Sequence, residues 1–319
     1  MALLREATHI IFMTALVLPF VDAAARDLIQ MPGVPPVDFS QPRGEPALAA
    51  PDSVSWQVFK NPVTLFIGGV AAVILELAEP AVRTGVWEHT TFRRDPGLRL
   101  RRTGLAAMVT VYGARSIAEP MIAGVVRRHD RVRGTTPAGE AYHANDIGLL
   151  TWVQATAAWG FAEAYSRYAR PLGQAELDRF YGEGAPAARL YGALDMPTTE
   201  VGVRAVFESM RPRLEPSPIV FEFLDIMRAA PVFPRAARPF QRLLVRAAVD
   251  MAPSWVRERL GLAPGHGLNA GQRWLVRRAG ALADRVLLPS SPAVQSCRRL
   301  GLPDDYLYSA ASAGSVRGP

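Results

Sequence analysis

Helix-forming segments separated by proline and glycine run through most of this chain and limit what it can fold into. From residue 63 onward, apolar residues recur at the spacing of helix faces, and Pro or Gly falls between successive segments. No convincing alternating pattern predicts a strand, and no internal repeat is present. The sequence therefore predicts an all-α protein. We expect helices over 63–75, 82–89, 99–112, 116–129, 147–168, 175–181, 185–190, 200–210, 219–229, 240–251, 255–260 and 272–287.

The composition is that of a globular protein with a sizeable core. The chain has 319 residues, of which 49% are apolar and 20% are charged. Cys297 is the only cysteine, which excludes an internal disulfide and a cysteine-based zinc site. The formal net charge is +7, and almost all of the positively charged side chains are arginines, because Lys60 is the only lysine. Because the arginines are interspersed with Asp and Glu and no nucleic-acid-binding pattern is present, we expect a solvated basic surface and no nucleic-acid partner.

The first thirty residues allow two interpretations. An apolar run from Ile10 to Val21 follows Arg5, which resembles a secretory signal and is too short for an ordinary transmembrane helix. Met31 is an alternative start, in which case residues 1–30 are a non-native leader. With a non-native leader we expect a cytoplasmic protein. A true signal would give an exported protein, or one that contacts a membrane through residues 1–25.

The remaining chain divides by composition. Pro and Gly are frequent before residue 55, and Pro, Ser and Gly are frequent after residue 287. The expected organisation is a leader over 1–30, an irregular arm over 31–54, one helical domain over 55–290 and a tail over 291–319. Within the domain, Gly68-Gly69 indicates close approach by another helix or by a flat ligand. The oligomeric state is left open.

The stretch from Arg99 to Trp152 carries the residues with the most chemistry. Arg99 and Thr103 are four residues apart, so a helix places them on one face. His129 lies near the end of the next helix, on its apolar face. Each ring nitrogen of such a histidine needs a partner, which is a metal, a haem iron or a backbone carbonyl. From the residues alone, a histidine satisfied inside the core is the commoner outcome.

The same stretch resembles the family that includes the fungal oxygenase MpaB and the bacterial latex clearing proteins, or rubber oxygenases. Residues 129–134 match the family motif His-x-x-Val-x-Gly in full, and the resemblance extends from Trp87-Glu88-His89 to about Tyr168 and more weakly over 55–260. In that family the motif histidine is the proximal ligand of a b-type haem. The resemblance therefore implies haem b bound through His129, in a multi-helical single domain with a globin-like core around a haem pocket.

The resemblance also assigns roles to residues on the preceding helix. Arg99 and Thr103 match an Arg-x-x-x-Thr pair near the haem, where a guanidinium and a hydroxyl suit a propionate or a bound oxygen species. Latex clearing proteins have a lysine just before that threonine, which can occupy the distal iron position. Here the residue is Arg102, and a protonated guanidinium is a poor metal ligand. Distal ligation by this side chain, and rubber as the substrate, are therefore disfavoured.

Glutamates and further histidines near the motif are secondary candidates. Glu76, Glu79 and Glu88 are each candidates to match the proposed catalytic glutamate of the family. Glu76 ends an apolar helix face, where burial would raise its pKa, although a solvent-exposed helix end is the commoner outcome. We expect His89 to play a structural role and His143 to be exposed in a loop over 134–145.

The function implied is that of a haem-b-dependent oxygenase. It would bind dioxygen at ferrous iron and act oxidatively on an apolar small molecule, for which an isoprenoid is one candidate. Two alternatives stay open from the sequence. One is a haem protein without catalysis, such as a store or sensor, and the other is a haem-free helical protein held to a membrane surface by residues 1–25 and basic charge.

Overall fold

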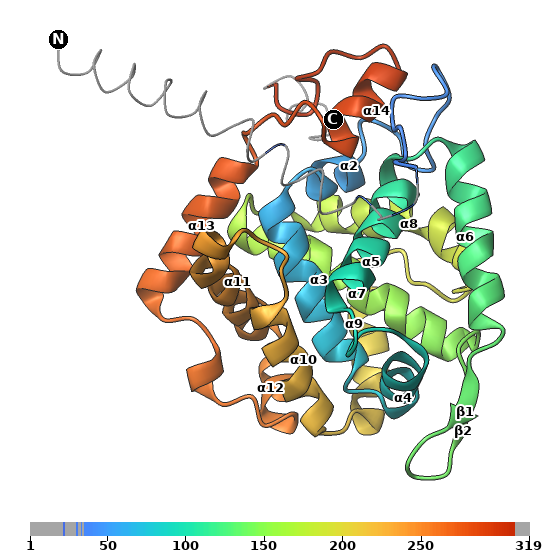
Figure 1. The fold of residues 1–319 in the computed structure, drawn as a ribbon, viewed down its shortest axis with the longest axis vertical. Helices are drawn as coiled ribbons and strands as arrows, with labels where there is room; N and C mark the ends of the chain where they lie inside the picture. The colour runs from blue at the N-terminus through green and yellow to red at the C-terminus, as the bar shows by residue number, and fades with distance from the viewer. Residues whose placement is uncertain (1–21, 23–29, 31–32, 34, 310–319) are drawn as a thin grey trace.

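The computed structural model describes residues 22, 30, 33 and 35–309; most of the leader expected over 1–30 lies outside these residues. The described part contains thirteen α-helices, three short 3-10 helices and one two-stranded hairpin, which confirms an all-α single domain (Figure 1). The helices are α2 (Val54–Phe59), α3 (Pro62–Glu76), α4 (Pro80–His89), α5 (Pro96–Tyr112), α6 (Arg115–His129), α7 (Ile147–Tyr168), α8 (Gln174–Tyr191), α9 (Glu200–Met210), α10 (Pro218–Ala229), α11 (Arg238–Met251), α12 (Ser254–Arg259), α13 (Ala270–Ala283) and α14 (Pro292–Arg299). The 3-10 helices are η1 (Arg211–Arg213), η2 (Arg235–Ala237) and η3 (Pro264–His266), and the strands are β1 (Arg133–Thr135) and β2 (Ala141–His143).

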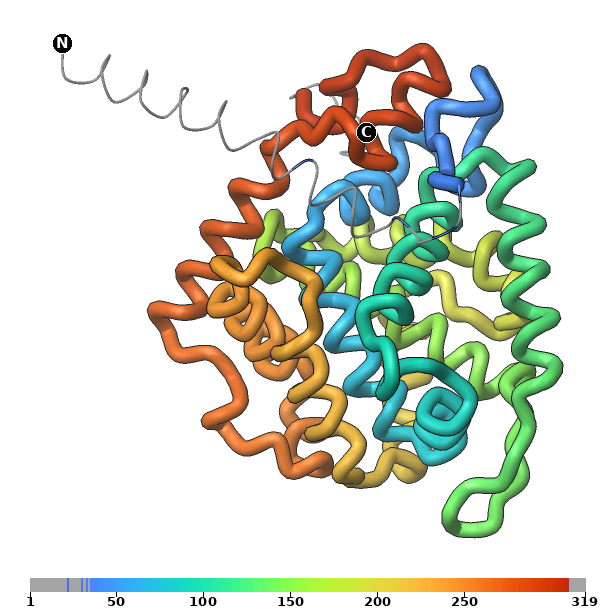
Figure 2. The backbone as a smooth tube through the Cα atoms, in the orientation of Figure 1, coloured from blue at the N-terminus to red at the C-terminus, as the bar shows by residue number. Residues whose placement is uncertain are grey.

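Helices α3 and α7 form the centre of the fold, with α11 and α13 packed against both of them (Figures 1 and 2). The two central helices touch at Gly68 and Gly160. A Cβ on Gly68 would lie 2.6 Å from the carbonyl oxygen of Gly160, and a Cβ on Gly160 would lie 2.5 Å from that of Gly68. Only glycine at both positions lets the backbones approach this closely. Of the two explanations that the sequence offered for Gly68, helix packing is therefore the one observed.

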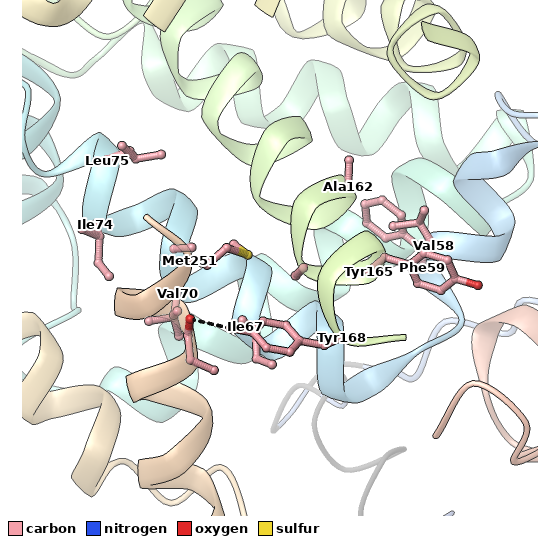
Figure 3. Close-up of a cluster of buried hydrophobic side chains, with 14 of the residues drawn as sticks. Val58, Phe59, Ile67, Val70, Ile74, Leu75, Ala162, Tyr165, Tyr168 and Met251 are labelled. Carbon is pink, nitrogen blue, oxygen red and sulfur yellow. Dashed lines mark hydrogen bonds between the residues drawn. The ribbon is translucent and has the colours of Figure 1, made fainter. Parts of the chain in front are cut away.

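The core at this crossing joins side chains from four helices (Figure 3). They are Val58 and Phe59 of α2, Ile67, Val70, Ile74 and Leu75 of α3, Ala162, Tyr165 and Tyr168 of α7, and Met251 of α11. The hydroxyl of Tyr168 donates to the carbonyl oxygen of Ala247 on α11 at 3.3 Å, so this buried polar group is satisfied.

The arm before α2 and the segment after residue 290 pack together against the helical core. Arg299, at the end of α14, is only 1% exposed. Its guanidinium donates to the carbonyl oxygens of Phe39, Glu45 and Tyr112 at 2.7–2.8 Å. A charge this far from water is tolerated because carbonyl acceptors surround it. These bonds join the arm, α5 and α14 into one unit, and α14 is a helix that the sequence did not predict.

Several predicted boundaries hold and others are corrected. Helix α7 has the expected bounds, 147–168, and Asp146 caps it by accepting from the amide of Leu149 at 3.1 Å. Helix α6 begins at Arg115, one residue before the expected start at 116. The hydroxyl of Ser116 does not cap the helix and donates to the carboxylate of Glu45. The two helices expected over 175–190 are one, α8, which continues through Pro186. The burial of Ala185 and Ala188 on either side of this proline helps to offset the lost backbone hydrogen bond.

The loop expected over 134–145 is instead a short hairpin. Strands β1 and β2 pair antiparallel, with Gly134 opposite Tyr142 and Arg133 opposite His143. A Cβ on Gly134 would lie 2.7 Å from the hydroxyl oxygen of Tyr142, so the glycine makes room for this ring. Strands of three residues are too short to show an alternating pattern in the sequence.

Among the described helices, none alone is both long and apolar enough to cross a lipid bilayer. Helices α3 and α4 pass that test only as a pair, across a bend of 111°.

Candidate functional site

His129 is the last residue of α6, and its imidazole is half-buried. The ring atom Nδ1 is buried and has no hydrogen-bond partner among the described residues. Burial lowers the pKa of His129, and the positive charges of Arg99 and Arg128 lower it further. The ring is therefore neutral at pH 7 and keeps a lone pair on one nitrogen. A neutral imidazole in this state is the form that binds a metal ion.

Most buried polar side-chain atoms without a hydrogen-bond partner belong to His129 and to residues that follow it closely in the sequence. Six of the eight such side-chain atoms in the described residues belong to residues 129–152. They are Nδ1 of His129, Oη of Tyr142, Nε2 of His143, Oδ1 of Asn145, Oγ1 of Thr151 and Nε1 of Trp152. Folded proteins keep few such atoms, because each costs about 1–3 kcal/mol. This stretch is thus the part of the described chain with the most unused hydrogen-bonding capacity.

His143 differs from its expectation as an exposed loop residue. It lies on β2 and is half-buried, and its Nε2 is 3.9 Å from the carboxylate of Asp130. The hairpin explains the difference, because it folds His143 back toward the end of α6 rather than leaving it in a polar loop. The charge of His143 is also one of those that bear on His129.

Arg99 and Thr103 share one face of α5, as their spacing predicts. The guanidinium of Arg99 donates to the hydroxyl of Thr103, which donates in turn to the carbonyl oxygen of Arg99 at 3.0 Å. Arg99 is half-buried, whereas Arg102 and Thr103 are exposed. Burial lowers the pKa of Arg99, and the carboxylate of Glu76 opposes that shift. The side chain remains a cation at neutral pH.

Glu76, the last residue of α3, has a pKa raised by burial to about 7. Arg99 and the hydroxyl of Thr156 oppose this rise without cancelling it. The commoner outcome for such a residue, an exposed helix end, is therefore wrong here. The structure brings Glu76 of α3 and His129 of α6 within the electrostatic range of one cation, Arg99 of α5. At neutral pH the carboxyl of Glu76 is close to half-protonated and can accept or release a proton.

The other two candidate glutamates have different surroundings. Glu79 is fully buried, caps α4 by accepting from the amide of Val82 at 2.8 Å, and pairs with Arg213 at 2.8 Å. These contacts give it a structural role. Glu88 is exposed at the end of α4. Glu76 thus remains the candidate that combines burial with a pKa of about 7.

A separate surface pocket of about 500 Å³ lies where α4 ends, and His89 lines it together with Trp87 and Arg93. His89 is exposed. Arg93 donates to the carboxylate of Glu222 at 2.9 Å, which ties this loop to α10. The pocket therefore has its own polar lining, and among the described residues no hydrogen bond or ion pair joins it to His129.

The donor set around His129 limits the kind of metal site. Among the described residues, no group of three or more His, Cys, Asp or Glu side chains is arranged to hold a metal ion. A haem differs from a bare ion because four of its ligands are porphyrin nitrogens, so one axial side chain suffices. The rings of Trp152 and Trp159 both pack on Phe207, with ring centres 5.2 and 5.4 Å away.

Comparison with protein-family models matches residues 56–285 to the catalytic domain described as "ER-bound oxygenase mpaB/B'/Rubber oxygenase". The match covers more than two thirds of the chain and includes Glu76, Arg99 and His129. No curated protein and no solved structure matches the chain.

Proposed function

Because the chain belongs to the MpaB/rubber oxygenase catalytic-domain family, we propose that it is a haem-b-dependent oxygenase in which His129 binds the iron. The observation that supports this proposal best is the state of His129. Its ring is neutral at pH 7, its Nδ1 is buried, and that atom has no partner among the described residues. One imidazole with a free lone pair, within electrostatic range of Arg99, fits the needs of a b-type haem.

The residues on α5 would hold the anionic parts of such a group. Arg99 and Thr103 already form one hydrogen-bonded unit, and a guanidinium with an adjacent hydroxyl suits a propionate carboxylate. Arg102, exposed on the same helix, adds a second positive charge. Its guanidinium has no lone pair at neutral pH, so it contributes charge rather than a bond to iron. When bound, haem would supply the activation of dioxygen.

Glu76 would manage protons in this site. The pKa of its carboxyl is about 7, so it can exchange a proton at neutral pH. The charge of Arg99 lowers this pKa, and the carboxylate of Glu76 in turn raises the pKa of Arg99. An oxidation that forms or consumes protons needs such a group near the reacting atoms. Helices α3 and α7 offer mainly apolar side chains around it, which favours an apolar substrate, with an isoprenoid as one candidate.

An absorption spectrum of the protein expressed with haem supply tests the cofactor. We expect a Soret band in the wild type and its loss in His129→Ala, with unchanged helical content by circular dichroism. His266→Ala is a matched control, because His266 lies in the short helix η3, outside the motif. A wild type without a Soret band, or an equal band per protein in His129→Ala, would overturn the assignment.

A second measurement separates an oxygenase from a haem store or sensor. We expect the haem-loaded wild type to consume dioxygen when prenyl lipids are added, whereas a store or sensor would only bind it. Haem loading without oxygen consumption on any apolar substrate tried would favour the non-catalytic alternative.

A further inference from the structure

One face of helix α13 packs closely against the core of the protein. A Cβ on Gly280 would lie 2.3 Å from the carbonyl oxygen of Tyr168, so α13 and the end of α7 are in backbone contact. The side-chain amide of Asn61 donates to the carbonyl oxygen of Gly280 at 2.9 Å, and Val276 is fully buried. The orientation of α13 is therefore fixed, and its opposite face points away from the protein.

That outer face is apolar where solvent would favour polar residues. Trp274, Leu275 and Leu282 are 60%, 47% and 65% exposed. The guanidinium of Arg278 lies over the ring of Trp274, 5.4 Å from its centre. Positions 274, 278 and 282 follow one another at intervals of four, so they form a single stripe along the helix. Figure 1 shows α13 at the edge of the molecule.

The positive charge of the protein gathers in the same region. Residues 235–285, which include α11, α12 and α13, contain ten arginines and three acidic residues, a net charge of +7. That equals the net charge of the whole chain, so the remaining residues balance to zero. Asp250 pairs with Arg273, and Asp284 pairs with Lys60. Among the described residues, no ion pair involves the exposed Arg277, Arg278 or Arg285, whose charge is therefore available to an anionic partner.

A third observation concerns the start of the chain. The backbone amide of Ser290, seven residues beyond α13, donates to the carboxylate of Asp22 at 3.0 Å. Asp22 directly follows the apolar sequence from Ile10 to Val21. Asp22 therefore lies beside the segment that follows α13.

We propose that the outer face of α13 docks on the surface of an anionic lipid bilayer. Trp274, Leu275 and Leu282 would enter the interfacial layer, where tryptophan is favoured and leucine gains from leaving water. Arg277, Arg278 and Arg285 would meet the lipid phosphates. The proposal does not depend on haem and stands apart from the proposed function.

The charges and the apolar side chains of this face disfavour two other partners, a second copy of the chain and a nucleic acid. A second copy of the chain would bring the arginines of both copies together across a two-fold axis, and like charges repel. A nucleic acid would satisfy the arginines but would leave Leu275 and Leu282 in water. A bilayer with anionic headgroups satisfies both the apolar and the basic side chains.

A label on α13 reports docking separately from any effect of the N-terminal sequence. Cys297 is the only cysteine and is fully buried, so Leu282→Cys in the full chain provides one accessible site for an environment-sensitive fluorophore. The matched control is Leu194→Cys, since Leu194 is 60% exposed and lies outside the basic region. The probes are vesicles of phosphatidylcholine with and without phosphatidylglycerol.

We expect the label at position 282 to shift to the blue and to become protected from an aqueous quencher only with the anionic vesicles. The label at position 194 should not change. An unchanged label at position 282 would overturn the proposal. A blue shift without vesicles that grows with protein concentration would also overturn it, in favour of self-association.

The arginines provide a second test on the same labelled protein. Because each basic residue near an anionic surface contributes about fivefold to binding, Arg277→Gln with Arg278→Gln should weaken vesicle binding on the order of tenfold or more. Arg43→Gln with Arg189→Gln, two exposed arginines outside the basic region, should leave it unchanged. Equal binding by both double variants would refute the electrostatic part of the proposal.

Discussion

Replacing Glu76 with glutamine is expected to change how stability depends on pH. Burial raises the pKa of Glu76 from 4.5 to about 7 in the folded protein. Between these values the folded state holds a proton that the unfolded state has lost, so the free energy of unfolding falls as pH rises toward 7 and levels off above it. At about 1.4 kcal/mol per pH unit, the full effect has an upper limit of about 3 kcal/mol. Partial solvent access reduces the expected change between pH 5 and pH 8 to about 2 kcal/mol.

Urea unfolding, followed by circular dichroism at a series of pH values, measures this effect without haem. Glu76→Gln cannot ionise, so its stability relative to wild type should rise by about 2 kcal/mol between pH 5 and pH 8. Burial also raises the pKa of Glu163, but this contribution is present in both proteins and cancels. Glu88→Gln, at an exposed position, should follow the wild type. Parallel profiles for Glu76→Gln and wild type would show that the reasoning about Glu76 is wrong.

Two further predictions concern the packing of α3 on α7 and the distal side of the proposed haem. Gly160→Ala places a methyl group 2.5 Å from a backbone oxygen of α3 and should lower the free energy of unfolding by about 2–3 kcal/mol or more in urea; Gly104→Ala, with no atom within 4 Å of its Cβ, should be neutral or stabilising. The ferric haem-loaded protein should bind added imidazole readily, because Arg102 has no lone pair to compete, and a low-spin spectrum that ignores imidazole would contradict this.

Features that depend on a few neighbouring residues could be predicted from the sequence. Asp146 caps α7 because a carboxylate there accepts amide hydrogen bonds from the first helical turn. Helix α9 has the predicted bounds, 200–210. The bond between Arg99 and Thr103 follows from helical spacing. In each case the interacting groups are separated by three or four residues, so the sequence contains the whole interaction.

Features that depend on distant parts of the chain could not be predicted. Helix α14 is held by Arg299, whose acceptors include Phe39 and Tyr112, far from it in the sequence. The pKa of Glu76 depends on burial among helices that only the fold brings together. The side-chain contact of Ser116 with Glu45 crosses from α6 to the arm, and local sequence gives no sign of it. The prediction of His129 as the ligand rests on a motif of six consecutive residues, which lies inside the region that matches the family model.

The charge of Arg99 acts on both other titratable residues of the candidate site, His129 and Glu76. Burial lowers the pKa of His129, and the positive charge of Arg99 lowers it further. The same charge lowers the pKa of Glu76 from the higher value that burial alone would give. The same cation thus favours a ligand-ready histidine and brings the carboxyl into the range where it exchanges protons at neutral pH. Within α5, the guanidinium of Arg99 also donates to the hydroxyl of Thr103. The Arg-x-x-x-Thr spacing therefore places on one helix the charge that couples α3 to α6.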